Sequence, residues 1–227
     1  MPTVADIAEI LASRDLKRFV GLKEDLFFEA KRARPYDLET ARGRYELLKD
    51  ASSFANASGG YLIMGLATEP VAAENTDQVI SLDLLSTDHF LASKIEGVLK
   101  THVCPVPREL VVGWLESGES PTLGVGYVYV PPQDETLKPF LMGGVLVDDE
   151  EVGAIVFGLV VRKGSSAEGV SIQTLQGWIK RGRASLEARI ANIENGMAIL
   201  LQNAKTTPTV PQKSLKEKLD EIARDDS

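Results

Sequence analysis

Apolar residues recur every three or four positions in two early stretches of the chain, which predicts two amphipathic helices. The first runs from Val4 to Leu11, and Thr3 with Asp6 matches the capping-box pattern at its start. The second runs from Leu38 to Ala57 with one apolar face. Ser58-Gly59-Gly60 follows it, and glycine readily takes the left-handed conformation in which helices end.

Shorter apolar runs without helical spacing predict strands at Asp25–Lys31 and Tyr61–Leu66. A further helix is predicted at Leu91–Leu99, with Ser86 or Thr87 as its cap. Four later apolar segments, separated by glycine and proline, are predicted strands: Glu109–Leu115, Gly124–Val130, Gly144–Val147 and Ala154–Arg162. This mixed order predicts an α+β fold, in which helices pack on a mixed, mostly antiparallel sheet.

A long C-terminal helix is predicted from a cap at Ser171 or Thr174 to about Ala204. Its apolar positions repeat as in a coiled-coil seam over about three heptads, interrupted by Arg183: Ile179, Leu186, Ile190, Ile193, Met197, Leu200 and Ala204. Two interpretations stay open, namely packing on the sheet or a homo-oligomer formed through residues 175–204. The expected organisation is a domain at 1–170, the helix at 171–205, and a linker with a charged tail at 206–227.

The net charge of −8 argues against a protein that coats nucleic acid, but the charge is unevenly distributed. Residues 14–50 hold ten basic and eight acidic side chains, and residues 162–183 hold five basic and one acidic. The net charges of these two stretches are +2 and +4, so the remaining residues of the chain carry a net charge of −14. The single cysteine, Cys104, excludes an internal disulfide and favours a cytoplasmic protein. The longest apolar stretch, Val152–Val161, is too short to span a membrane.

Glu24, Glu29 and Lys31 form the first candidate site. Residues two apart on a strand point to the same side, so Glu29 and Lys31 are expected to be neighbours. Two carboxylates beside a lysine can hold Mg²⁺ or Mn²⁺ in a nuclease, where the metal polarises a phosphate and activates water. The spacing is equally typical of an exposed Glu–Lys pair on a strand edge.

A glycine-rich turn at Asn56–Gly60 follows the second helix. Anions bind at helix N-termini, whereas this turn follows a C-terminus, so a structural cap with Asn56 bonded to nearby backbone is expected. No P-loop sequence occurs in the chain, which gives no support to a nucleotide-binding ATPase. Arg162-Lys163-Gly164-Ser165 provides a second basic element after a strand, and its charges could equally be ordinary solvated surface charges.

Together these elements resemble the Schlafen AlbA-like family over about residues 20–170. The likeness is carried by Glu24 with Phe28-Glu29-Ala30-Lys31 and, most specifically, by the stretch from Phe54-Ala55-Asn56 through Gly59-Gly60 to Gly65-Leu66. Val130-Pro131 with Pro139-Phe140, and Val161 to Ser165, match more weakly. The resemblance implies a mixed α/β domain that is associated with nucleic acid.

Members of that family that cleave RNA use three carboxylates around a divalent metal. Glu24 and Glu29 match two of them, and Lys31 matches the lysine that follows. The third acid is expected just after the strand that ends at Gly65-Leu66, but Ala67 and Thr68 stand there and Glu69 comes one residue late. Asp50 could substitute only if its helix places it nearby. The catalytic set is therefore incomplete by this comparison.

Three hypotheses follow. The leading one is a nucleic-acid-binding protein, for DNA or RNA, whose contacts to the phosphate backbone are Lys31, Arg32, Arg34, Arg42, Arg44, Arg162 and Lys163. The second is an endonuclease that depends on Mg²⁺ or Mn²⁺, with Glu24, Glu29 and Lys31 as catalytic residues and Glu24, Glu29 and Glu69 as metal ligands. The third is an oligomeric scaffold or regulator that uses the C-terminal helix and has no nucleic-acid activity.

Overall fold

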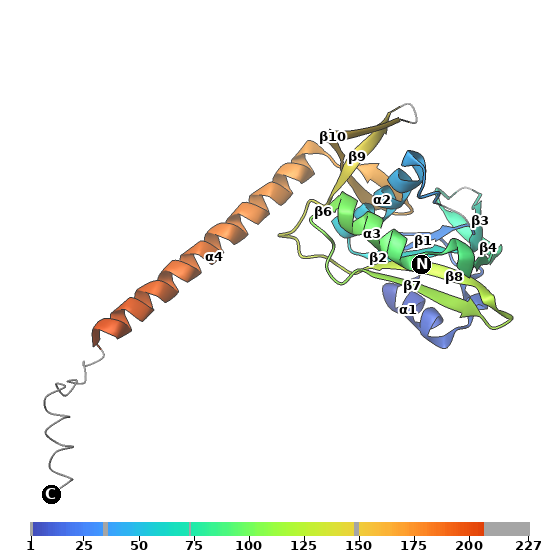
Figure 1. The fold of residues 1–227 in the computed structure, drawn as a ribbon, viewed down its shortest axis with the longest axis horizontal. Coiled ribbons are helices and arrows are strands. Elements are labelled where there is room, and N and C mark those ends of the chain that lie inside the picture. Colours follow the sequence, from blue (N-terminus) through green and yellow to red (C-terminus); the bar gives the residue numbers. More distant parts are fainter. Residues whose placement is uncertain (1, 34–35, 73, 148–149, 207–227) are drawn as a thin grey trace, which may run out of the picture. The chain divides into compact units, whose positions relative to one another are not determined.

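The computed structural model describes residues 2–33, 36–72, 74–147 and 150–206 (Figure 1). Its helices are α1 (Val4–Ser13), α2 (Ala41–Asn56), α3 (Ala92–His102) and α4 (Ile172–Thr206), with 3-10 turns η1 (Leu16–Phe19) and η2 (Thr87–His89). Its strands are β1 (Phe28–Lys31), β2 (Gly60–Met64), β3 (Leu66–Pro70), β4 (Asp77–Leu82), β5 (Leu85–Ser86), β6 (Val103–Cys104), β7 (Val111–Ser117), β8 (Ser120–Val130), β9 (Leu141–Val147), β10 (Glu150–Gly158), β11 (Val160–Lys163) and β12 (Ser166–Gly169). The predicted α+β fold is confirmed.

A five-stranded sheet forms the centre of the first compact unit, Met1–Gly182. Strand β8 pairs along one edge with β2 and β5 and along the other with β7. Strand β1 adds to β2 in parallel, with Phe28 opposite Tyr61, and helix α2 is the crossover between them. The other strand pairs of the described chain are antiparallel, including the small sheets β10-β9-β6, β11-β12 and β3-β4.

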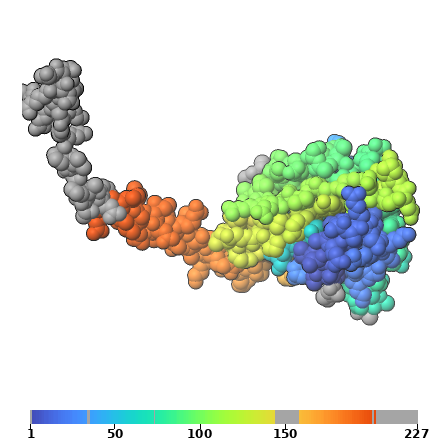
Figure 2. All heavy atoms as spheres, turned by 90° about the horizontal axis from the view of Figure 1, so that it is seen from below, coloured from blue at the N-terminus to red at the C-terminus, as the bar shows by residue number. Residues whose placement is uncertain are grey.

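Both faces of the central sheet are covered. Leu62 and Met64 of β2 pack with α2 and α3 in one apolar cluster, whereas Tyr61 and Ile63 pack with α1 in the other. This alternation has the period of two that a strand imposes, and burial on both faces explains why β2 reads as an unbroken apolar run. Helix α1 lies beside β7 and β8 on the second face (Figure 2).

The capping predictions had different outcomes. The capping box of Thr3 and Asp6 is confirmed, since Thr3 accepts from the Asp6 backbone and Asp6 accepts from the Thr3 backbone. Helix α2 begins at Ala41, three residues after the predicted start, because Thr40 caps it. The cap predicted for the helix after Thr87 is wrong: Ser86 caps η2, and α3 begins at Ala92 without a side-chain cap.

The predicted strands differ from the structure chiefly in their number. The expected strand Ala154–Arg162 is divided into β10 and β11 around Leu159. Strands β3, β4, β5, β6 and β12 were not predicted, because each is at most six residues long and polar residues interrupt the apolar pattern of the longer ones. Their pairing partners, rather than their own composition, hold them in extended conformation.

Helix α4 begins where the sequence predicts, with the Thr174 N–H donating to the Ser171 hydroxyl over 3.1 Å. Trp178 is buried, but the helix from Arg183 onward belongs to a second unit, Arg183–Ser227. Leu186, Ile190 and Ile193 of that unit are exposed, and both packing on the sheet and a homo-oligomer stay predictions. The predicted linker and tail lie, from residue 207 on, outside the described residues. No described helix is long and apolar enough to cross a membrane.

Candidate functional site: a buried charge network

Strand β1 presents Glu29 and Lys31 to the same side, as predicted, while Phe28 and Ala30 enter the opposite apolar cluster. The Lys31 ammonium lies 2.5 Å from Glu29 Oε1 and donates a hydrogen bond to it. Glu29 is buried and Lys31 is only partly exposed. The alternative of an exposed Glu–Lys pair is therefore wrong, because Asp50 of α2 and Arg162 of β11 lie against these two side chains.

Arg162 of β11 forms an ion pair with the other carboxylate oxygen of Glu29. Its Nη1 lies 2.5 Å from Glu29 Oε2, although this contact lacks hydrogen-bond geometry. Its Nε donates to the Asp25 carbonyl and its Nη2 to the Phe28 carbonyl, and the guanidinium stacks 4.9 Å from the Phe54 ring centre. The Arg162 side chain is 1% exposed, which corrects its predicted role: a buried, paired guanidinium is not a surface phosphate contact.

Asp50 of α2 completes the pairing. Its Oδ2 accepts a 2.7 Å hydrogen bond from the Tyr36 hydroxyl and lies 3.3 Å from the Lys31 ammonium. Sequence reasoning named Asp50 only as a conditional substitute. A stronger signal was available, because Asp50 lies three residues after Leu47 and four before Phe54, on the buried face of its helix. An acid at such a position requires a partner.

Glu24 lies before β1 and is held by the backbone, with its Oε1 accepting from the Ala30 N–H at 3.1 Å. Burial, followed by the negative charge of Glu29, raises the pKa of Glu24 to about 7, although the hydrogen bond from the Ala30 backbone N–H opposes this shift. Glu24 is thus the group at this site that exchanges a proton near neutral pH. We call Glu24, Glu29, Lys31, Asp50, Arg162 and Tyr36 the buried charge network.

Within the network, burial and the neighbouring carboxylates shift the pKa of Lys31 and of Tyr36. Burial alone lowers the pKa of Lys31, but the charges of Asp50 and Glu29 outweigh this and raise it above its usual value. Burial, followed by the Asp50 charge, raises the pKa of Tyr36 well above its usual value.

Glu69, the third expected metal ligand, is exposed on β3 opposite Gln78. Its side chain has no hydrogen bond or ion pair to another described residue. Within the ranges that the structure describes, no group of three or more His, Cys, Asp or Glu side chains is placed to hold a metal ion. The structure therefore brings together Glu24 and Glu29 of the predicted metal set, and metal binding stays a prediction.

The remaining basic candidates are in several environments. Arg32 and Arg42 are exposed, while Arg44 is partly buried and donates to the carbonyls of the chain that precedes α2. Lys163 is 61% exposed and pairs with a neighbouring glutamate at 2.8 Å. Arg34 lies outside the described residues.

The Asn56 side chain forms hydrogen bonds to residues far along the chain, whereas a local cap would bond only to nearby backbone. Its side-chain amide donates to the carbonyls of Phe140 and Val160, and its oxygen accepts from the Phe140 N–H, each over 2.8 Å. The prediction of bonds to nearby backbone is therefore wrong, and Asn56 connects α2 to segments more than eighty residues away. Gly59 has a φ of +78°, and a Cβ there would lie 2.6 Å from the Val130 carbonyl oxygen. This requirement explains why glycine follows the helix.

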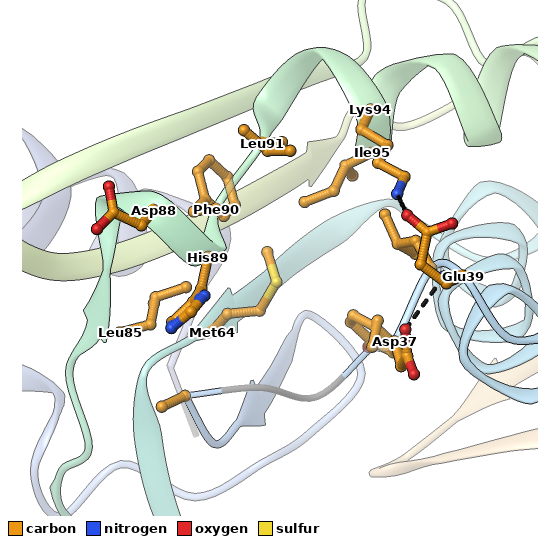
Figure 3. Close-up of a pocket in the computed structure, with 13 residues that line it drawn as sticks. Asp37, Glu39, Met64, Leu85, Asp88, His89, Phe90, Leu91, Lys94 and Ile95 are labelled. Atoms are coloured by element: carbon orange, nitrogen blue, oxygen red, sulfur yellow. Dashed lines mark hydrogen bonds and ion pairs between the residues drawn. The ribbon is translucent and has the colours of Figure 1, made fainter.

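A pocket of about 450 Å³ borders the network (Figure 3). Its apolar wall consists of Met64, Leu85, Phe90, Leu91 and Ile95. Its polar rim is mainly acidic, with Asp37, Glu39, Asp88, His89 and Lys94, and Lys94 forms an ion pair with Glu39. Tyr36 lines this pocket and also donates to Asp50, so it is the group shared by the pocket and the network.

Comparison with known proteins gives little beyond this geometry. The chain matches no protein-family model and none of the curated proteins. Among solved structures, it is similar to the N-terminal domain of a protein from Nitrosomonas europaea that is described as related to the ATP-dependent DNA helicase RecG. The likeness covers 76% of this chain and 95% of that domain, at 19% identity and a TM-score of 0.34. Conclusions about function therefore rest on the residues of this chain.

Proposed function

We propose that this chain binds nucleic acid through the sugar–phosphate backbone, with the exposed side chains of Arg32 and Lys163 as phosphate contacts. One observation carries the proposal: the ion pair of Glu29 and Arg162 fastens β11 to β1. Successive residues of an extended chain point to opposite sides, so burial of Arg162 leaves the adjacent Lys163 in solvent. Arg32, directly after the partly buried Lys31, is exposed and has no ion-pair partner among the described residues. Arg32 and Lys163 therefore each follow a residue of the buried charge network, and both cationic side chains are exposed.

The strength of binding follows from the charge balance. Phosphate contacts release counterions, so affinity falls as salt rises, with a slope set by the number of contacts. The chain as a whole carries −8, which repels phosphate away from these two cations. A few local contacts against this background support weak binding that depends strongly on salt and little on base sequence.

The experiment is fluorescence anisotropy with labelled single- and double-stranded DNA and RNA, titrated at several salt concentrations. Arg32→Ala and Lys163→Ala are each expected to weaken binding and to reduce the slope of log affinity against log salt by about one. Lys17→Ala is a matched control for Lys163→Ala, because Lys17 is exposed on η1 and also pairs with a glutamate. Affinity that does not change with salt, or equal effects of the Lys17 and Lys163 variants, would contradict the proposal.

A metal-dependent nuclease is the second candidate, favoured by Glu24, a buried carboxyl with a pKa of about 7 beside Glu29. The carboxylate donors fit a metal poorly as arranged, because Lys31 donates a hydrogen bond to one oxygen of Glu29 and the Arg162 guanidinium lies 2.5 Å from the other. A divalent ion would have to displace one of these cations. No reaction step is therefore assigned to a metal.

The nuclease is tested by incubating the same oligonucleotides with Mn²⁺ or Mg²⁺ and following cleavage on denaturing gels. Cleavage that requires the ion and disappears in Glu29→Gln would support it. Binding without cleavage under all of these conditions would contradict the nuclease and be consistent with the binding proposal. Thermal unfolding of Glu29→Gln, measured alongside, shows whether the variant is folded during the assay.

A further inference from the structure

Helix α4 carries a row of exposed large apolar side chains. We define the seam as Leu186, Ile190, Ile193, Met197 and Leu200, which all lie in the second unit. Their exposed fractions range from 48% to 69%. Five large apolar side chains at this exposure on one helix are unfavourable in water, and such a patch is typical of an interaction surface.

The spacing of the seam specifies the kind of occupant. Leu186, Ile193 and Leu200 are seven residues apart and Ile190 and Met197 lie between them, which places them at d and a positions of a heptad. A strict heptad seam fits a second helix with the same repeat, because knobs of one helix then enter the holes of the other. The helix that certainly carries this repeat is α4 of another copy.

The charges beside the seam specify its orientation. In this register Arg189 is at a g position and Glu194 at the e position of the next heptad. In a parallel pair a g residue faces the e′ residue of the following heptad, so Arg189 would meet Glu194 of the partner, and the reverse. In an antiparallel pair, g faces g′ and e faces e′, which brings like charges together. Within the described chain, neither Arg189 nor Glu194 has an ion-pair partner.

We propose that α4 associates with α4 of a second copy as a parallel, two-stranded coiled coil through the seam. Two strands are favoured because Arg183 occupies the preceding a position, from which a long cation reaches water most easily in a dimer. The inference does not depend on nucleic-acid binding.

Sedimentation velocity of the full chain over a dilution series tests the association. The expected mass is twice the 24.6 kDa of one chain, with dissociation on dilution. Ile193→Asp is expected to raise the dimer dissociation constant by at least about 100-fold, since it places a charge in the seam. Ile199→Asp is the matched control, because Ile199 is 59% exposed against 61% for Ile193 but lies outside the seam.

Two further variants test the orientation. Arg189→Glu is expected to weaken the dimer, and Arg189→Glu combined with Glu194→Arg to restore it. Leu200→Cys in a Cys104→Ser background is expected to form a disulfide between copies on oxidation, because only a parallel pair brings two Leu200 positions within bonding distance. A monomeric wild type at the highest concentration, equal effects of the Ile193 and Ile199 variants, or no crosslink at Leu200 would each overturn the proposal.

Discussion

Replacing Arg162 by methionine removes the guanidinium from the buried charge network while keeping an unbranched apolar side chain. In the folded protein this guanidinium is paired with Glu29, donates to two backbone carbonyls and stacks on Phe54. Its loss leaves the Glu29 carboxylate buried with Lys31 as its remaining cation. It also leaves the carbonyls of Asp25 and Phe28 without these donors.

The expected loss of stability is about 3–5 kcal/mol, the range observed when one partner of a buried ion pair is removed. Lys163→Met is the matched control, because the neighbouring ion pair to Glu168 is exposed and contributes at most about 1 kcal/mol. Urea unfolding monitored by the fluorescence of Trp114 and Trp178 measures both. Equal losses in the two variants would refute the view that the network stabilises the fold.

A double variant separates charge from packing. Arg162→Met with Glu29→Met removes both charges and the uncompensated carboxylate together, so it is expected to be more stable than Arg162→Met alone. A double variant that is less stable than Arg162→Met would show that the loss arises from packing and from the backbone hydrogen bonds instead.

Two further stability predictions concern Glu24 and Asn56. The folded pKa of Glu24, about 7, exceeds its usual value of 4.5, so the native state retains a proton that the unfolded chain releases, and stability falls as pH rises through this window. Glu24→Gln is therefore expected to be more stable than wild type at pH 8 by about 3 kcal/mol and nearly equal at pH 4 in urea unfolding, with the exposed Glu69→Gln unchanged; a difference independent of pH would contradict this. Asn56→Ala is expected to lose about 3 kcal/mol or more in the same measurement, because the buried Phe140 N–H and two carbonyls lose their partner. The exposed Asn192→Ala should lose little, and a similar loss in both would argue against these hydrogen bonds.

Part of the site could be predicted from the chain alone because it depends on local geometry. Glu29 and Lys31 are two apart on a strand, and this spacing puts them on one side wherever the strand lies. Whether that side of the strand is buried depends on the other segments of the chain that pack against it. Asp50 and Arg162 come from 21 and 133 residues after Glu29, and no local pattern relates them to β1. The same limit applies to Asn56, whose partners belong to distant segments.

By itself the sequence determined the α+β class, the main helices, the cap of α1, the start of α4 and its heptad seam. Each of these follows from periodicity or capping over a few neighbouring residues. Only the tertiary structure decided that β8 is the central pairing strand, that Arg162 is buried against Glu29, and that the side chains of the α4 seam are exposed. These outcomes depend on contacts between residues far apart in the chain, and burial, which sets both the pKa of Glu24 and the role of Arg162, exists only once those contacts form.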